Sequence, residues 1–127
     1  MMVGSTRETG RRGEEAACEF LRREGHTIVE RNWRSSHLET DIITSDKDGI
    51  HFVEVKTRNA PVAAEPESNI TRTKRLRMVR AAQSYLHGSG RPWMRDKEVF
   101  FDVVTVVLDG DSATVEYYPQ AFIPTYV

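Results

Sequence analysis

Two acidic residues and one lysine near the middle of the sequence have the types and spacing to bind a metal ion. Asp41 lies in one apolar stretch, and Glu54 and Lys56 lie two positions apart in the next. Side chains of a strand alternate between its two faces, so Glu54 and Lys56 share a face, and a hairpin between the stretches would place Asp41 beside Glu54. Two adjacent carboxylates repel each other unless a cation or a proton lies between them. The pattern therefore predicts a cation site.

The chemistry that suits these residues is hydrolysis of a phosphodiester bond. Carboxylate oxygens favour a hard divalent cation such as Mg²⁺ or Mn²⁺. Such an ion polarises a phosphate and lowers the pKa of its bound water. Lys56 would orient that water or stabilise the extra negative charge of the transition state. The alternative is that Glu54 and Lys56 form an ordinary exposed ion pair, and the residues alone leave both interpretations open.

A helix predicted over residues 8–24 would add a third carboxylate. Its apolar residues recur at helical spacing, and Gly25 follows its end. Glu14 lies on the apolar stripe, so we expect it to face the two strand acids and to bind the metal directly or through water. Gly10 and Gly13 each cost about 1 kcal/mol relative to alanine in a helix. This cost indicates that something approaches that side of the helix closely.

The remaining pattern predicts an α/β fold with the order α-β-β-β-α-β-β. A helical crossover between the third and fourth strands favours parallel pairing there, and the short connections favour antiparallel hairpins. The predicted sheet is therefore mixed and covered by helices. After the first helix we expect strands at residues 27–34, 38–44 and 50–57, a mobile loop at 58–70, a helix at 71–87, and strands at 98–108 and 113–118.

Charge is unevenly distributed along the chain. Residues 38–55 carry five acidic side chains and one basic one, whereas residues 56–80 carry seven basic and two acidic ones. The basic block is either a solvated surface or a surface that binds the phosphate backbone of a nucleic acid. In the second reading the nucleic-acid-binding residues are Arg58, Arg72, Lys74, Arg75, Arg77 and Arg80. The apolar residues expected to face the core from the second helix are Leu76, Val79, Ala82 and Leu86.

The composition is typical of one globular domain. The chain has 127 residues, of which 39% are hydrophobic and 29% charged, and we expect a single domain over residues 1–127 with its core at about 7–118. Cys18 is the only cysteine, which excludes an internal disulfide and a cysteine-based zinc site. The sequence has no apolar run of about 18 residues and no signal-peptide pattern. We therefore expect a cytoplasmic protein with no membrane partner.

The histidines do not form a recognisable motif. They are scattered through the chain and lack the i, i+4 pair that a zinc protease carries on a helix. We interpret them as surface or packing residues: His26, His37, His51 and His87. Asp102 lies in an apolar strand, where it either supports the acidic site or pairs with a buried base.

A series of short motifs, in order from about residue 7 to 108, resembles the YraN family of small bacterial proteins. Two single positions, Gly25 and Lys74, match the family as well as the motifs do. The motifs are Gly10-x-x-Gly13-Glu14-x-x-Ala17, Arg31-Asn32, Glu39-x-Asp41-Ile42-Ile43, Phe52-Val53-Glu54-Val55-Lys56-x-Arg58 and Phe101-Asp102-Val103-Val104. That family is similar to Holliday-junction resolvases and, more widely, to the PD-(D/E)xK nucleases.

The resemblance implies a restriction-endonuclease-like core and a metal-dependent endonuclease that acts on DNA, including branched or structured DNA. It assigns Asp41, Glu54 and Lys56 to the nuclease motif and Glu14 to the helix carboxylate. Related resolvases are dimers, so a homodimer is implied as well. The sequence departs from the family pattern at Leu38, Thr40 and Phe100. The missing glycine at Leu38 and the missing arginine at Phe100 favour an alternative, a module that binds nucleic acid or a partner protein and has a vestigial nuclease site.

Overall fold

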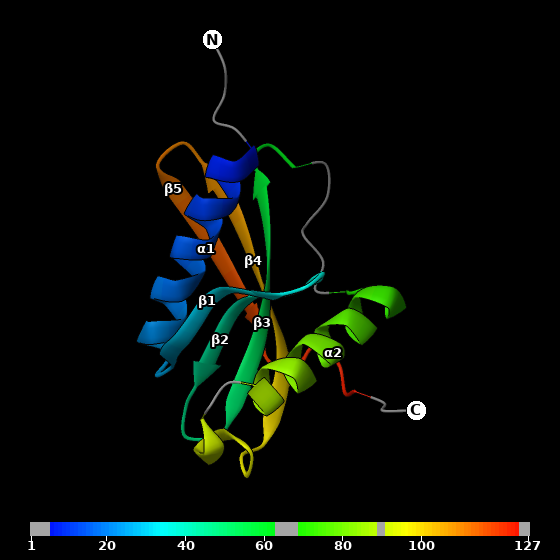
Figure 1. Ribbon diagram of the computed structural model, residues 1–127. Helices are drawn as coiled ribbons and strands as arrows, with labels where there is room; N and C mark the ends of the chain where they lie inside the picture. The colour runs from blue at the N-terminus through cyan, green and yellow to red at the C-terminus, as the bar shows by residue number, and fades with distance from the viewer. Residues whose placement is uncertain (1–5, 63–68, 89–90, 125–127) are drawn as a thin grey trace.

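A five-stranded mixed sheet forms the centre of the molecule, and one helix packs on each of its faces (Figure 1). The computed structural model describes residues 6–62, 69–88 and 91–124. Along the chain the elements are α1 (Thr6–Arg23), β1 (Thr27–Ser35), β2 (Leu38–Ser45), β3 (Ile50–Asn59), α2 (Arg72–Gly88), the short 3-10 helix η1 (Pro92–Met94), β4 (Val99–Asp109) and β5 (Ser112–Tyr118).

The strand order and directions confirm the predicted α/β fold class. Strands follow one another across the sheet in the order β1-β2-β3-β4-β5. The pair β3–β4, which is joined through α2, is parallel, and the other three pairs are antiparallel. Apart from η1, which was not predicted, each element lies within two residues of its predicted bounds. The mixed sheet therefore follows from the hairpin turns and the single helical crossover.

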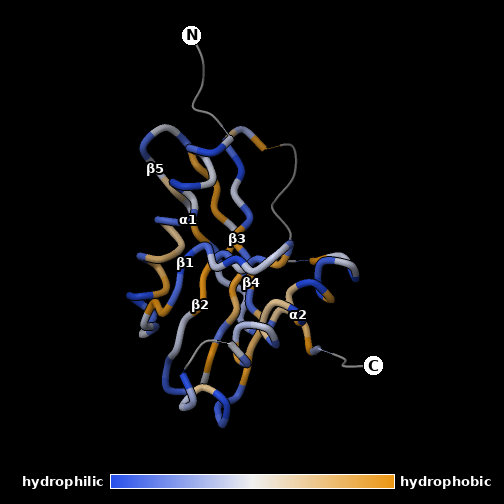
Figure 2. The backbone as a smooth tube through the Cα atoms, viewed as in Figure 1, coloured by the Kyte–Doolittle hydropathy of each residue, from blue (hydrophilic) through white to orange (hydrophobic). Residues whose placement is uncertain are grey.

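Helix α1 covers one face of the sheet through a small apolar stripe. Ala17, Cys18 and Leu21 are fully buried against apolar side chains of the central strands. Figure 2 shows the hydrophobic residues concentrated along these central strands. Gly13 lies directly against β3, and a Cβ atom at this position would lie 2.8 Å from the Cβ of Thr57. The close approach expected at the helix glycines is therefore present at Gly13, and it brings the neighbouring Glu14 down onto the sheet.

Helix α2 covers the opposite face, but its buried side differs in part from the prediction. Val79 and Ala82 are buried as expected, whereas Leu76 is 37% exposed and Leu86 is only partly buried. Met78 and Tyr85 fill the core in their place. These two larger side chains lie on the same side as Ala82, and they turn the buried stripe of the helix away from Leu76.

The sheet divides between β2 and β3. These strands pair only from Ile42 to Ser45, opposite Ile50 to Val53. The earlier part of β2 remains paired with β1, while β3 continues beside β4 as far as Asn59. In Figure 1 the tip of the β1–β2 hairpin accordingly crosses in front of β3. We call this divergence the fork, and Asp41 and Glu54 are the first residues beyond the paired segment.

The segment predicted as a mobile loop over residues 58–70 needs one correction. Arg58 and Asn59 belong to β3, because their backbones continue the parallel ladder with β4. Residues 63–68 lie outside the described residues, so the predicted mobility stays a prediction. Among the parts of the chain that the structure describes, neither helix combines the length and the apolar character of a membrane crossing.

Candidate active site

Asp41 and Glu54 meet at the fork. Because β2 has left β3 at this point, the Val55 amide is free to donate to a side chain, and it donates to Oδ2 of Asp41 over 2.8 Å. Burial raises the pKa of Asp41 to about 7, and the nearby carboxylates of Glu54 and Glu14 contribute to this shift. Like charges therefore gather here, as the strand alternation predicted, and a bound cation would relieve their repulsion.

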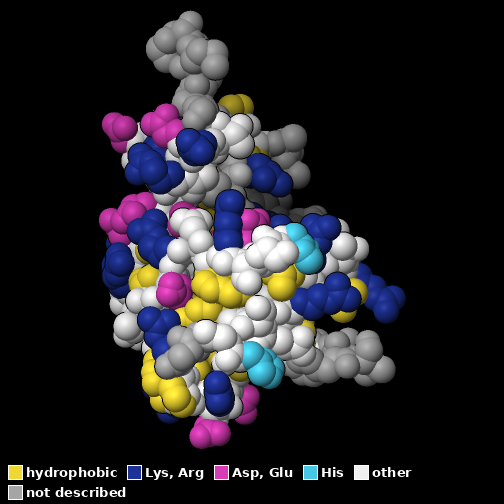
Figure 3. Space-filling view, in the orientation of Figure 1, with side chains coloured by type: hydrophobic (Ala, Val, Ile, Leu, Met, Phe, Trp, Pro, Cys, Tyr) yellow, Lys and Arg dark blue, Asp and Glu magenta, His cyan; other side chains and the backbone are white. Residues whose placement is uncertain are grey.

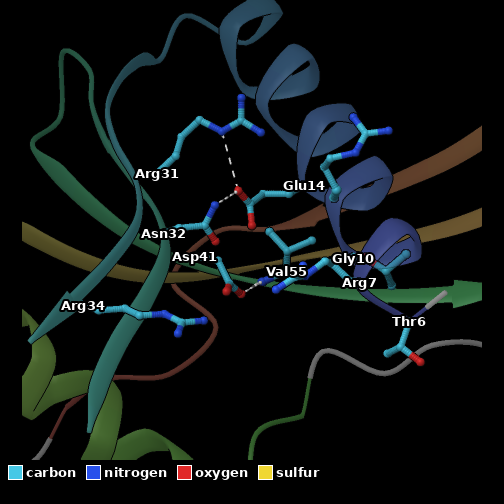
Figure 4. A pocket seen from close by; sticks show the side chains of 11 residues that line it. Thr6, Arg7, Gly10, Glu14, Arg31, Asn32, Arg34, Asp41 and Val55 are labelled. Carbon is cyan, nitrogen blue, oxygen red and sulfur yellow. Dashed lines mark hydrogen bonds and ion pairs between the residues drawn. The ribbon is translucent and has the colours of Figure 1, made fainter. Parts of the chain in front are cut away.

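Glu14 enters the same region from α1 and is held by β1. Its side chain is nearly buried, and its Oε1 accepts a hydrogen bond of 2.7 Å from Nδ2 of Asn32. Nε of Arg31 lies 3.5 Å from the same oxygen. Asn32 has a φ of 53°, a backbone conformation that asparagine tolerates better than most residues. Figure 4 shows Glu14 and Asp41 directed into one space between α1 and the β1–β2 strands.

The three carboxylates are not packed into one tight cluster. Within residues 6–62, 69–88 and 91–124, only His26, Asp46 and His51 bring three candidate ligand atoms within 4.8 Å of one another. Mg²⁺ commonly binds one or two carboxylates and keeps several waters, and the pair of Asp41 and Glu54 fits that pattern. The all-oxygen donor set thus fits a hard divalent cation.

Two lysines flank the acids, and one of them was not expected there. Nζ of Lys56 donates to the backbone carbonyl of Asn69, just before α2. Nζ of Lys74 forms an ion pair of 2.7 Å with Oε2 of Glu54, and the hydrogen bond between them raises the pKa of Lys74. Lys56 was the only basic partner expected for the strand acids, so the pairing of Glu54 with Lys74 corrects that expectation. The sequence could not reveal it, because it depends on where the N-terminal end of α2 docks.

A cleft of about 460 Å³ opens over Glu14 and Asp41. Four arginines from α1 and β1 contribute to its lining: Arg7, Arg11, Arg31 and Arg34. Figure 3 shows Lys and Arg side chains spread over the upper and middle parts of this face, with Asp and Glu side chains among them in the upper part. Sequence reasoning assigned phosphate binding to residues 58–80 and missed the cleft. A signal was present, because positions 7, 11 and 14 of α1 share one helix face.

The basic residues predicted to bind nucleic acid differ in their local surroundings. Arg58 is exposed on β3, and Arg77 and Arg80 are exposed on α2. Arg75 donates from Nε to the carbonyl of Ile70, and its guanidinium lies 5.8 Å from the centre of the Phe122 ring. Together with Arg72 it lines a separate hollow beside Leu76 and Ile123. Lys74 instead belongs to the acidic site.

Comparison with known proteins places the chain in a family. The model of "Uncharacterised protein family UPF0102" matches residues 13–106, a span that includes Glu14 and all three residues of the predicted nuclease motif. A UPF0102 protein of Nitratidesulfovibrio vulgaris (strain DP4) is 42% identical over 121 residues, which cover 95% of this chain and 88% of the relative. A UPF0102 protein of Bacteroides thetaiotaomicron is 36% identical over 117 residues, covering 92% of this chain and 93% of the relative.

A third relative extends the range of organisms. A UPF0102 protein of Myxococcus xanthus is 37% identical over 116 residues, which cover 91% of this chain and 90% of the relative. UPF0102 is the YraN family that the sequence motifs resemble, so that prediction is confirmed. The chain is a member of the UPF0102 family.

Proposed function

We propose that this protein is a divalent-metal-dependent endonuclease that hydrolyses phosphodiester bonds in DNA, with branched or structured DNA as its substrate class. One observation carries the proposal: Asp41 and Glu54 meet at the fork, and Asp41 also lines, with Glu14, a cleft to which four arginines contribute. The resemblance of the Asp41, Glu54 and Lys56 motif to PD-(D/E)xK nucleases supports the same conclusion. The α/β order of the elements is compatible with it.

The acidic residues provide the metal site in this proposal. Asp41 and Glu54 would hold Mg²⁺ or Mn²⁺, which would require Asp41 to lose its proton and Glu54 to release Lys74. Glu14, held by Asn32 and Arg31, would help to orient a water at this site. When bound, the ion supplies Lewis acidity toward the phosphate and a more acidic water.

The basic residues act on the substrate. Lys56 leaves the Asn69 carbonyl and donates either to the attacking water or to the phosphate oxygen that gains charge in the transition state. Arginines of the cleft bind phosphates on either side of the scissile bond, because a guanidinium can donate two parallel hydrogen bonds to phosphate oxygens. The exposed residues Arg58, Arg77 and Arg80 would extend this contact along the phosphate backbone of the DNA.

Cutting both strands of a branched substrate would require two active sites. A homodimer supplies them with two copies of one chain, related by a two-fold axis that matches the symmetry of such a substrate. Sedimentation of the purified protein with and without a four-way DNA junction measures this directly. A dimer is expected in the complex.

A second candidate is a module that binds nucleic acid or a partner protein and has lost cleavage. Its support is that Glu54 and Lys56 both have protein partners, Lys74 and the Asn69 carbonyl. The departures at Leu38 and Phe100 favour it as well.

Replacement of Lys56 separates the two candidates. The variant Lys56→Met keeps a side chain of similar length, so we expect the fold and DNA binding to persist. Loss of the charge should slow cleavage about 10²-fold or more, as removal of one preorganised stabilising group does in other enzymes. Lys47→Met, in the exposed β2–β3 turn, is the matched control. The substrates are four-way and flapped DNA, linear duplex and RNA, each with Mg²⁺ and with Mn²⁺.

Each outcome of this experiment favours one of the two candidate functions or rejects the assignment of Lys56. Cleavage by the wild type and by Lys47→Met, with loss in Lys56→Met, supports the nuclease. If the wild type binds DNA but cuts none of these substrates, the second candidate replaces it. If Lys56→Met cuts as fast as the wild type, the catalytic assignment of Lys56 is wrong.

A further inference from the structure

Two histidines that are far apart in the sequence meet at the end of the β2–β3 hairpin away from the fork. His26 follows α1, Asp46 begins the turn after β2, and His51 is the second residue of β3. The side chains of these residues are 3%, 13% and 6% exposed, respectively. The expectation that the histidines are packing residues holds for their burial. It misses that two of them share one aspartate.

The Nε2 atoms of both rings approach the carboxylate of Asp46. His51 Nε2 lies 2.9 Å from Oδ1, and His26 Nε2 lies 3.6 Å from Oδ2. The two ring centres are 4.6 Å apart. All three ligand atoms lie within 4.8 Å of one another. One ion placed between them would therefore be within reach of two imidazole nitrogens and one carboxylate oxygen.

The other nitrogen of each ring is already fixed by a hydrogen bond. Nδ1 of His26 lies 2.6 Å from Oγ1 of Thr44, and Nδ1 of His51 lies 2.6 Å from Oδ2 of Asp102. Metal-binding histidines characteristically have their second nitrogen held in this way, which fixes both the ring orientation and the tautomer. Both imidazoles are thus oriented with Nε2 toward Asp46.

The supporting groups are fixed in turn. The buried carboxylate of Asp102 accepts hydrogen bonds from the Tyr117 hydroxyl at 2.5 Å and from the backbone amide of Gln120 at 2.9 Å. Oδ1 of Asp46 accepts from the amides of Asp48 and Gly49. The site is therefore built before any ion arrives, which lowers the entropic cost of binding one.

We propose that His26, Asp46 and His51 bind a first-row divalent transition-metal ion such as Zn²⁺, through the two Nε2 atoms and one oxygen of Asp46. Imidazole nitrogen favours Zn²⁺ and its neighbours over Mg²⁺, whereas the all-oxygen fork favours Mg²⁺ or Mn²⁺. The two sites therefore select different ions. The bound ion would connect the start of β1, the β2–β3 turn and β3, and so stabilise the hairpin whose other end carries Asp41 and Glu54. This inference does not depend on the proposed nuclease.

The competing explanation for the same geometry is a protonated His51 bridging Asp46 and Asp102, with no metal involved. Metal-stripped protein titrated with Zn²⁺ distinguishes the two, followed by calorimetry and by the ¹⁵N shifts of the four histidine rings. We expect one Zn²⁺ per chain and a change at Nε2 of His26 and His51. The exposed rings of His37 and His87 serve as internal controls. If Zn²⁺ causes no change at His26 and His51 of the wild-type protein, the proposed site is wrong.

Matched aspartate variants locate the ion. Asp46→Asn preserves an oxygen that can accept from the turn amides but removes the charge, and it should weaken Zn²⁺ binding at least tenfold. Asp48→Asn, an exposed residue of the same turn, should bind as the wild type does. Asp41→Asn, at the fork, should also leave the Zn²⁺ affinity unchanged. Loss of Zn²⁺ binding in Asp41→Asn with retention in Asp46→Asn would place the ion at the fork and overturn the inference.

Discussion

The charged residues at the fork have protein partners, and a metal ion or a substrate would have to replace two of them. Glu54 pairs with Lys74, Lys56 donates to the Asn69 carbonyl, and Asp41 accepts from the Val55 amide. Only the last of these bonds is compatible with metal binding as it stands, because the second oxygen of Asp41 is not engaged by it. At the scale of single residues, binding is therefore an exchange of partners rather than the filling of an empty cage.

The protonation of Asp41 gives this picture a pH dependence. Its pKa is raised to about 7, from an ordinary value of 3.8, by burial and by Glu54. A carboxyl with a raised pKa binds its proton more tightly in the folded state, so stability should fall as the pH rises from about 4 to about 7. In EDTA, Asp41→Asn should therefore melt higher than the wild type at pH 8, by about 4 °C for each 1 kcal/mol recovered, and the gap should shrink at pH 5.

Thermal unfolding of both proteins at the two pH values tests this expectation. Adding Mn²⁺ at pH 8 should raise the melting temperature of the wild type, because the ion binds only the folded state, and should do less for Asp41→Asn. An equal difference between the proteins at pH 5 and pH 8 would mean that the Asp41 carboxyl does not titrate with a raised pKa.

At the scale of elements, the two glycines of α1 have different structural roles. A Cβ on Gly13 would overlap the side chain of Thr57 on β3, whereas a Cβ on Gly10 would have nothing within 4 Å. The short distance between α1 and β3 sets the depth at which Glu14 reaches the fork. Gly13 is therefore needed for close packing, and Gly10 is left with the ordinary cost of glycine in a helix.

Alanine substitutions measure this difference. We expect Gly13→Ala to destabilise the protein by about 1–2 kcal/mol, since overpacking costs about 1–3 kcal/mol and better helix propensity returns part of it. Gly10→Ala should instead stabilise it by up to about 1 kcal/mol. Urea unfolding gives both values, and similar effects for the two variants would refute the close contact between α1 and Thr57.

Element order was predictable because each element carries a local pattern, but the placement of several side chains was not. Strand alternation predicted that Asp41 and Glu54 lie together, and the helical stripe predicted that Glu14 is directed at the sheet. The divergence of β2 from β3 has no local signal, because Asp41 lies in a strand that continues to pair with β1. The ion pair of Lys74 with Glu54 depends on tertiary docking in the same way.

The placement of the two buried histidines could not be predicted from the sequence either, because they are far apart in the chain. His26 and His51 are 25 positions apart, and no spacing in the sequence predicts that they face Asp46 together. The cleft arginines are an intermediate case, because Arg7 and Arg11 share a helix face with Glu14 whereas Arg34 joins them only through the fold of β1.

At the scale of the whole molecule, positive charge is divided between the cleft and the exposed side of α2. The chain as a whole has a formal net charge of −1, so binding to DNA would depend on this local arrangement and not on overall charge. The cleft arginines line the same cavity as Asp41 and Glu14, and we expect them to contact the phosphates nearest the scissile bond.

Salt dependence tests the cleft. Each lost phosphate contact should lower the magnitude of the slope of log affinity against log salt concentration by about one. Arg11→Gln should show this loss, and Arg23→Gln, at the opposite end of α1, should not. The measurement is fluorescence anisotropy of a labelled DNA junction at several salt concentrations. An unchanged slope in Arg11→Gln would remove the cleft from the DNA-binding surface.

The most direct test of the central claim is a crystal structure of the protein soaked in Mn²⁺, with anomalous scattering used to locate the ion. An anomalous peak between Asp41 and Glu54, about 2 Å from one oxygen of each, is the expected result. In the same map Lys74 should have moved away from Glu54. Fully ordered carboxylates with Lys74 still bound to Glu54 and no anomalous peak at the fork would contradict the proposed metal site, and with it the nuclease.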